Sequence, residues 1–283
     1  MMVSDHHAPQ YFCIPTSSTG DPMRTSQHSD FRPELDDYEF AVDMPSEQLN
    51  GPTELPVTLS FNDTAYASVL ATPDDLEAWA VGFAYSEGMI TRAAQVGEIT
   101  IHRLRHGVRV RLAVPAHVER LAEENRRVTS ASSSCGRCGS AEEAQMLEGL
   151  KRLPKRTPPT AQHVREALAW LEEEGRAGLH VALGLGMNGE RLGVGIDIGR
   201  HNALDKLIGA SLMKHNGKGE RPAFVLLSSR CSLELVQKTV RADIPALATL
   251  SHPSNLAVDI ARLCGLNLIC CHRGRRLTLL SQG

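Results

Sequence analysis

The strongest constraint on the fold is a regular alternation of strand and helix patterns after residue 160. Short apolar runs predict strands at 179–185, 192–198, 223–227, 246–250, 266–271 and 277–280. Apolar residues that recur every three or four positions predict helices at 160–174, 202–215, 232–242 and 254–264. Two strands followed by helices that alternate with strands are typical of a layered α/β domain with a mixed sheet.

A smaller α/β part is expected before this domain. Strand patterns occur at 55–62, 66–70, 98–104 and 108–114, the first two as a hairpin around Asn62-Asp63. Between them, Thr72 is placed to cap a helix and Pro73 to occupy its first position. Gly88 is expected to end that helix.

The chain therefore divides into four predicted parts. The segment Arg127–Ser140 is rich in serine and glycine and has no apolar period, which is typical of a mobile loop. The parts are a flexible N-terminal tail at 1–36, an N-terminal α/β subdomain at 37–126, the mobile cysteine loop with a linker at 127–159, and the α/β domain at 160–283.

Composition and charge exclude several classes of protein. With 42% hydrophobic and 22% charged residues, the chain can bury a substantial core. A net charge of -3 argues against nucleic acid as the main partner. No apolar run reaches the roughly 18 residues of a membrane helix, and the N-terminus lacks a signal-peptide layout. We therefore expect a cytoplasmic protein with no membrane partner.

Cys135 and Cys138 are the most reactive-looking pair among the seven cysteines. They lie three positions apart in Ser-Cys-Gly-Arg-Cys-Gly, and the positive charge of Arg137 favours a thiolate. A structural zinc site needs two further ligands and no second pair is present, so no metal site is predicted. We interpret the segment that holds the pair as a loop that carries a nucleophilic thiolate. The alternative is that both are surface cysteines without a role. The other cysteines of the patterned regions (Cys231, Cys264, Cys270 and Cys271) fit buried small hydrophobes.

Polar residues also gather where a predicted strand meets the helix at 202–215. They are Arg200, His201, Asn202, Asp205 and Lys206. The last four fall opposite the apolar face of the helix, whose N-terminus suits an anion. The alternative is a solvated amphipathic helix in which His201 and Asp205 pair.

Further polar groups follow other predicted strand ends. They are His180, Ser229, Arg230 and the turn of His272, Arg273, Gly274, Arg275 and Arg276. Alone, each has an ordinary structural alternative: a core histidine, a helix cap with a surface arginine, or a basic hairpin turn. Together they lie at strand ends of one predicted sheet, where ligands of α/β folds bind, and arginines recur. The sequence therefore predicts a site for a polyphosphate ligand such as a nucleotide-bearing cofactor.

With these residues assembled, the sequence resembles the FdhD/NarQ family of formate dehydrogenase accessory sulfurtransferases. The similarity is carried by Ala71–Leu76, the Cys135/Cys138 loop, Gly199–Lys206, Ser229-Arg230 and the final arginine turn. It implies a cytidine-deaminase-like mixed sheet with helices on both faces, a smaller N-terminal α/β subdomain, and a homodimer.

The resemblance also implies a chemistry. A cysteine desulfurase passes sulfur to Cys135 as a persulfide, and Cys138 assists. The sulfur then goes to molybdenum bis(molybdopterin guanine dinucleotide), held by the segment from Cys271 to Arg276, before that cofactor enters formate dehydrogenase or a related molybdoenzyme. The chain departs from the family pattern at Ile196, Arg176-Ala177, Cys271 and Leu280.

Three alternative functions remain open from the residues. A zinc-dependent deaminase needs a His-x-Glu before a Pro-Cys-x-x-Cys, but the cysteine pair here precedes His180, and Ala182 replaces the glutamate. A non-catalytic chaperone could bind the molybdenum cofactor without moving sulfur. A redox protein could use Cys135 and Cys138 as a dithiol.

Overall fold

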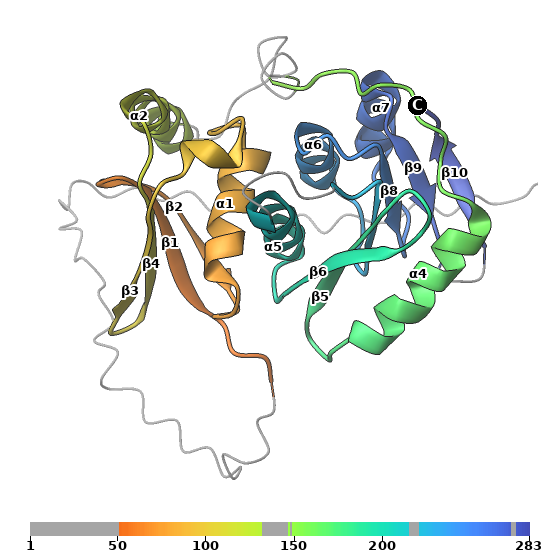
Figure 1. The fold of residues 1–283 in the computed structure, drawn as a ribbon, viewed down its shortest axis with the longest axis horizontal. Coiled ribbons are helices and arrows are strands. Elements are labelled where there is room, and N and C mark those ends of the chain that lie inside the picture. The colour runs from red at the N-terminus through yellow and green to blue at the C-terminus, as the bar shows by residue number, and fades with distance from the viewer. Residues whose placement is uncertain (1–50, 132–146, 148, 215–220, 273–275) are drawn as a thin grey trace, which may run out of the picture. The chain divides into compact units, whose positions relative to one another are not determined.

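The computed structural model describes residues 51–131, 147, 149–214, 221–272 and 276–283, which form two β-sheets with helices packed between and around them (Figure 1). The N-terminal tail expected at 1–36 lies outside the described residues. Among the described residues, helices that are both long and apolar enough to cross a membrane are absent.

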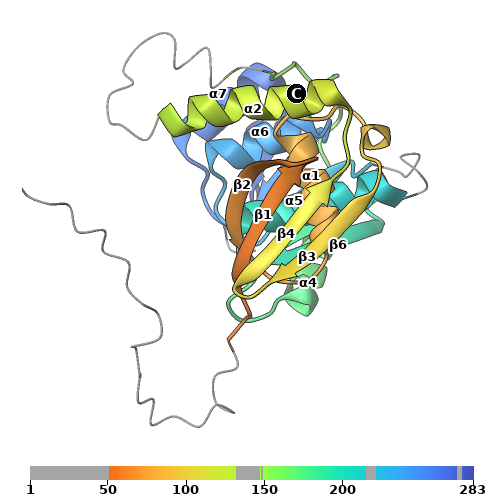
Figure 2. The ribbon, with the colours of Figure 1, turned by 90° about the vertical axis from the view of Figure 1, so that its left-hand side faces the viewer.

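The smaller sheet has the strand order β2-β1-β4-β3. Its strands are β1 (Leu55–Phe61), β2 (Thr64–Ala71), β3 (Ile99–Leu104) and β4 (Gly107–Leu112). β1 is antiparallel to β2 and parallel to β4, and β3 is antiparallel to β4. The helices of this part are α1 (Leu76–Ser86), a short 3-10 turn (Ala93–Gln95) and α2 (Ala116–Ala131). Figure 2 shows this sheet face on, with α2 crossing one end of it.

The larger sheet has the order β10-β9-β8-β7-β5-β6. Its strands are β5 (His180–Leu185), β6 (Arg191–Asp197), β7 (Phe224–Leu227), β8 (Ala246–Thr249), β9 (Asn267–Cys270) and β10 (Thr278–Ser281). The strands β7, β8 and β9 are parallel, whereas β5 and β10 run antiparallel to their neighbours. The mixed sheet predicted from the alternating pattern is confirmed.

Helices cover both faces of the larger sheet, as expected. They are α4 (Ala161–Glu174), α5 (Arg200–Met213), α6 (Leu233–Arg241) and α7 (Asn255–Cys264). On β5, Val181 and Leu183 belong to a hydrophobic cluster with α4, while Ala182 belongs to the main core with α5, α6 and α7. Successive strand residues point to opposite faces, so this alternation requires a helix layer on each side.

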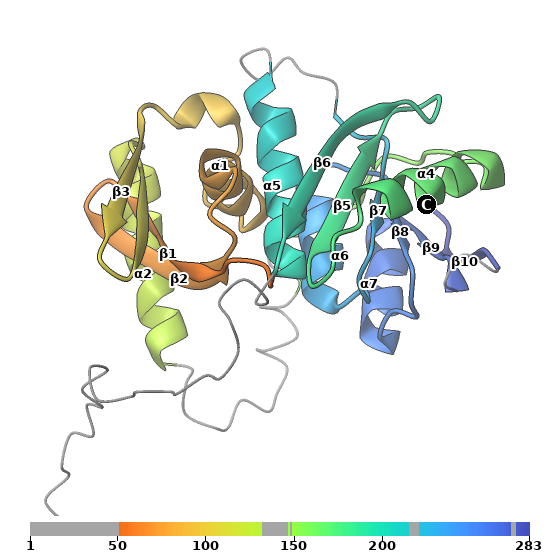
Figure 3. The same cartoon turned by 90° about the horizontal axis from the view of Figure 1, so that it is seen from below.

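Helices α1 and α5 lie side by side between the two sheets (Figure 3). Their backbones touch at two glycines. A Cβ added at Gly82 would lie 1.8 Å from the carbonyl oxygen of Asp205, and one added at Gly209 would lie 1.8 Å from that of Ala78. Because only glycine permits this approach, these two positions set the distance between the helices.

Several predicted helix ends are confirmed at atomic detail. The hydroxyl of Thr160 accepts the backbone N–H of His163 and so caps α4. The hydroxyl of Ser254 caps α7 in the same way, and Gly265 ends that helix at a φ of 67°. These caps depend on residues within one turn, which sequence patterns read well.

Two local predictions are wrong. Thr72 does not cap α1, because its backbone N–H and hydroxyl both donate to Asp197, 125 residues away; the helix begins after Asp75. Residues 127–131, expected in a loop, continue helix α2, which the sequence analysis missed. α2 forms because Val118 and Ala122, one turn apart, are buried in the main core. The four-part division of the chain stays a prediction.

Candidate functional site

The strand ends singled out from the sequence meet at one edge of the larger sheet. His180 at the start of β5 pairs with Asp197 at the end of β6. Next along the edge, the backbone N–H of Ser228 donates to the carbonyl oxygen of Val181. The end of β8 then pairs with the ends of β7 and β9, through Thr249. We call these strand ends and the residues that follow them the ligand edge.

Asp197 organises the β6 end of the ligand edge. Its carboxylate is fully buried and accepts hydrogen bonds from the backbone N–H groups of Thr72 and Gly199, at 3.0 and 2.8 Å. It also accepts from Asn202 Nδ2 at 3.0 Å and forms an ion pair with Lys206 Nζ at 2.7 Å. This network joins the turn before α5 to the end of β2.

A second buried ion pair starts from Asp205, the residue before Lys206 in α5. Asp205 contacts Lys238 Nζ of α6 at 3.0 Å and accepts a 2.6 Å hydrogen bond from Ser86 Oγ. Glu87 shares the same ammonium at 2.7 Å. Burial raises the pKa of Asp205 to about 6, against the opposing charge of Lys238. The pKa of Lys238 is also raised, because burial, which lowers it, is outweighed by the charges of Asp205 and Glu87. Two carboxylates therefore compete for one cation inside the protein.

The alternative interpretation of α5 as a solvated amphipathic helix is wrong. Asn202, Asp205 and Lys206 are buried, and each is held by partners within the chain. Asn202, for example, also accepts from Trp79 Nε1 and donates to the carbonyl oxygen of Leu70. The pairing of His201 with Asp205 that this alternative includes does not form, because the Asp205 carboxylate pairs with Lys238 instead. Because other elements pack around α5, its polar side chains are buried as well and need hydrogen-bond or ion-pair partners within the chain. Ligand binding by these three residues stays a prediction.

The residues around the start of α5 and α6 are more open. Arg200 and Arg230 are exposed, and His180 and His201 are half-buried. Burial, with the charge of Arg200 next, lowers the pKa of both histidines, which favours neutral imidazoles. His201 Nε2 contacts Ser232 Oγ at 3.3 Å. Ser229 is buried, and its hydroxyl donates to the carbonyl oxygen of Arg230. This stretch offers two guanidinium groups and two imidazoles at one end of the sheet.

The turn between β9 and β10 lies at the far end of the same edge. Arg276 is exposed, whereas Arg273, Gly274 and Arg275 lie outside the described residues. Cys271, predicted to contact a ligand, is fully buried in the cluster beneath α4. Burial and the neighbouring Cys270 raise the pKa of Cys271 to about 12, so its thiol stays neutral. It packs in this structure as a hydrophobe, and its predicted contact with a ligand is untested.

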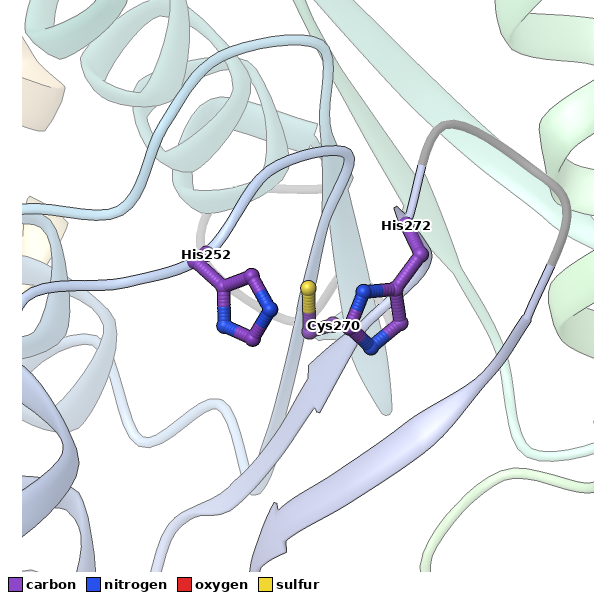
Figure 4. A group of neighbouring side chains, drawn as sticks. All are labelled: His252, Cys270 and His272. Atoms are coloured by element: carbon purple, nitrogen blue, oxygen red, sulfur yellow. The ribbon is translucent and has the colours of Figure 1, made fainter.

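Sequence reasoning missed a cluster of three side chains at this end. His252 follows β8, Cys270 ends β9 and His272 begins the next turn. Figure 4 shows the sulfur of Cys270 between the two imidazoles. The imidazole rings of His252 and His272 are in edge contact, with centroids 4.7 Å apart. The strand-end rule that selected the other groups applies to His252 as well, whereas Cys270 fitted a core position.

The cysteine pair predicted to carry the chemistry, Cys135 and Cys138, lies outside the described residues. Helix α2 ends at Ala131, four residues before Cys135. The assignment of these cysteines as nucleophiles stays a prediction.

Comparison with known proteins identifies the family. The model of the FdhD/NarQ family matches residues 52–283. A sulfur carrier protein FdhD from Burkholderia mallei is 39% identical over 234 residues, which cover 76% of this chain and 82% of that protein. One from Acinetobacter baylyi is 33% identical over 241 residues, covering 81% and 85%.

The fold is also found among solved structures. The crystal structure of a proposed formate dehydrogenase accessory protein from Desulfotalea psychrophila matches with a TM-score of 0.59 at 22% identity. The match covers 81% of this chain and 87% of that one. The resemblance read from the motifs is thereby confirmed, and the chain belongs to the FdhD/NarQ family.

Proposed function

We propose that this protein is a sulfur carrier that matures formate dehydrogenase. Its Cys135 accepts persulfide sulfur from a cysteine desulfurase. The protein then transfers this sulfur to molybdenum bis(molybdopterin guanine dinucleotide), and the cofactor enters formate dehydrogenase or a related molybdoenzyme. The observation that carries the proposal is the family match over residues 52–283, which includes both Cys135 and Cys138. Relatives that cover most of the chain are named sulfur carrier protein FdhD.

The proposed sulfur transfer uses two thiols in sequence. The Cys135 thiolate attacks the outer sulfur of the desulfurase persulfide, which breaks the sulfur–sulfur bond there and releases the desulfurase thiolate. The new persulfide then rests on Cys135. Attack by the Cys138 thiolate on the inner sulfur forms a Cys135–Cys138 disulfide and releases the outer sulfur as sulfide to the molybdenum. A cellular thiol reductant restores both cysteines.

The open part of the ligand edge suits the recipient. The guanine dinucleotide arms of that substrate carry phosphates, which arginine side chains bind through paired hydrogen bonds. Arg200, Arg230 and Arg276 are exposed there and free of short ion pairs in the part of the chain that the structure describes. The neutral histidines His180 and His201 can donate or accept one hydrogen bond each. We therefore assign the phosphates to this edge.

Intact mass measurement tests the sulfur carrier step. The full-length protein is incubated with a cysteine desulfurase and cysteine, and its mass is read with and without reductant. The proposal predicts a gain of one sulfur atom that reductant removes and that is absent in Cys135→Ala. Cys264→Ser, a buried cysteine at the end of α7, is the matched control and should gain the sulfur normally.

A different result would change the assignment. A protein that gains no sulfur from an active desulfurase, or whose Cys135→Ala variant still gains it, is not a carrier that uses Cys135. If Cys135→Ala also restores formate dehydrogenase activity in cells that lack the native protein, the function is instead that of a chaperone that binds the cofactor without moving sulfur. We further propose that the carrier acts in the cytoplasm. We also propose that it is a homodimer, and light scattering on the purified protein tests this oligomeric state.

A further inference from the structure

The cluster of His252, Cys270 and His272 offers metal-ligating atoms that the proposed sulfur transfer does not use. One ligand atom from each side chain, two imidazole nitrogens and a thiol sulfur, lie within 4.8 Å of one another. The three residues come from two adjacent parallel strand ends, since Thr249 of β8 pairs with Cys270 of β9. The sheet register therefore brings together side chains that are 18 and 20 residues apart along the chain.

The spacing is close to what a tetrahedral metal requires. Metal–nitrogen and metal–sulfur bonds of about 2.0–2.3 Å put ligand atoms roughly 3.3–3.8 Å apart. The longest pair here, at no more than 4.8 Å, needs to close by at most about 1.5 Å. His252 is exposed on the loop after β8, so its side chain can move that far without disturbing the core.

The surroundings of His272 support the same use. Its Nε2 contacts Thr278 Oγ1 of β10 at 2.9 Å, which leaves Nδ1 for a metal. Metal-binding histidines usually have their second nitrogen held by such an outer partner, which fixes the ring orientation. His272 is also held at a φ of 40°, a left-handed conformation that favours glycine. The fold thus holds the imidazole beside Cys270 at some cost in backbone energy.

The cysteine of the cluster is buried in a way that fits a ligand. Cys270 has no exposed surface, and in the described residues its sulfur has no hydrogen-bond partner. A nitrogen of each imidazole lies within 4.8 Å of its sulfur (Figure 4). A thiolate with two imidazoles suits zinc and similar borderline metals, whereas calcium and magnesium prefer oxygen ligands.

We propose that His252, Cys270 and His272 form a binding site for a borderline divalent transition metal of the zinc type. Three protein ligands leave the fourth position for water or an anion, which distinguishes a reactive or ligand-binding site from a closed structural one. The site lies on the ligand edge, next to the turn that carries Arg276. No carboxylate of the described residues joins the cluster, so it lacks the glutamate that a nucleobase deaminase needs.

The test uses cobalt as a probe, because a thiolate bound to Co²⁺ absorbs by charge transfer. Cys135 and Cys138 could bind metal themselves, so both are first changed to serine in the full-length chain. The proposal predicts that this background variant binds one equivalent of Co²⁺ with the thiolate band, and that excess Zn²⁺ removes the band. Adding Cys270→Ser should abolish the band, while Cys264→Ser, another buried cysteine, should leave it unchanged.

Two further variants, one at His252 and one at the partner of His272, keep the result independent of folding defects at the buried cysteine. His252→Ala changes an exposed side chain and should weaken zinc affinity at least about 100-fold in competition with a chromophoric chelator. Thr278→Val removes the outer partner of His272 and should weaken it about 10-fold. The proposal is overturned if the background variant binds no cobalt, if the band survives Cys270→Ser, or if His252→Ala binds zinc as tightly as the background variant.

Discussion

The two ends of the ligand edge differ in how their polar groups are used. At the β6 end, Asp197, Asp205 and Lys206 are buried and held by partners within the chain. At the β9 end, Arg276 and His252 are exposed, and the Cys270 thiol lies close to the imidazoles of His252 and His272. The first end therefore holds the two sheets together through α1 and α5, while the second end leaves an arginine and a histidine exposed to solvent.

This difference shows that a motif specific to a family need not be exposed to a ligand. Gly199–Lys206 carries much of the resemblance to the family, yet three of its polar side chains serve the packing of α5. A recognisable motif can thus be kept for the buried network that it builds. The open groups come instead from single residues after separate strands.

The largest predicted effect on stability is at the β6 end of the ligand edge. Lys206→Ala removes the cation beside the fully buried carboxylate of Asp197. Leaving a buried charge unpaired is expected to lower the free energy of unfolding by about 3–5 kcal/mol, measured by urea denaturation at pH 7. Arg200→Ala, an exposed change at the start of the same helix, should cost under about 0.5 kcal/mol. A loss below about 1 kcal/mol for Lys206→Ala would show that the network does not hold this end.

The contact between α1 and α5 gives the next largest effect. In Gly209→Ala the new methyl group meets the carbonyl oxygen of Ala78 at 1.8 Å, so the helices must separate. We expect a loss of about 3 kcal/mol in unfolding free energy by the same denaturation experiment. Gly97→Ala is the control, since its Cβ would lie 3.5 Å from its nearest neighbour. Equal effects of the two changes would contradict the close packing.

The buried Asp205 predicts a pH dependence of stability. Its pKa in the folded protein is about 6 against 3.8 for an ordinary aspartate, so the folded state binds the proton more tightly. The stabilisation that this group contributes is full below pH 3.8 and is lost as the pH rises through 6.

Comparing the protein with Asp205→Asn isolates this contribution. The unfolding free energy of the unchanged protein minus that of the variant should fall by up to about 3 kcal/mol between pH 4 and pH 7. Denaturation at a series of pH values measures it. A difference that stays constant or rises with pH would contradict the raised pKa.

The smallest effects on stability belong to the exposed arginines of the ligand edge. Arg230→Ala and Arg276→Ala remove exposed side chains and should change the free energy of unfolding by no more than about 0.5 kcal/mol. Thermal or urea denaturation of the two variants checks this. A loss of more than about 1 kcal/mol in either variant would show that the exposed groups also have a structural role, which would weaken the contrast with the buried network.

Much of the fold was predictable because its signals are local. Strand alternation, the hydroxyl caps of Thr160 and Ser254 and the glycine stop at Gly265 each depend on a few neighbouring residues. Thr72 was misread as a cap because its partner Asp197 is 125 positions away. α2 was missed because only a narrow stripe of it, with Val118 and Ala122, faces the core.

The candidate site was predictable only in part. The gathering of strand ends at one edge followed from the order of strands and helices, and the sheet register confirms it. Which polar groups are buried could not be predicted, because burial depends on the packing of α1 and α6 against α5. The cluster of His252, Cys270 and His272 was missed because β8 and β9 had to be paired first.

Amide hydrogen exchange with and without GDP tests the contrast between the two ends most directly, since GDP carries the guanine and the phosphates of the proposed substrate. The account predicts that saturating GDP slows exchange at residues 228–232, 250–252 and 271–277, with no change at 202–206. Slower exchange confined to 202–206, or no slowing at the β9 end, would contradict it.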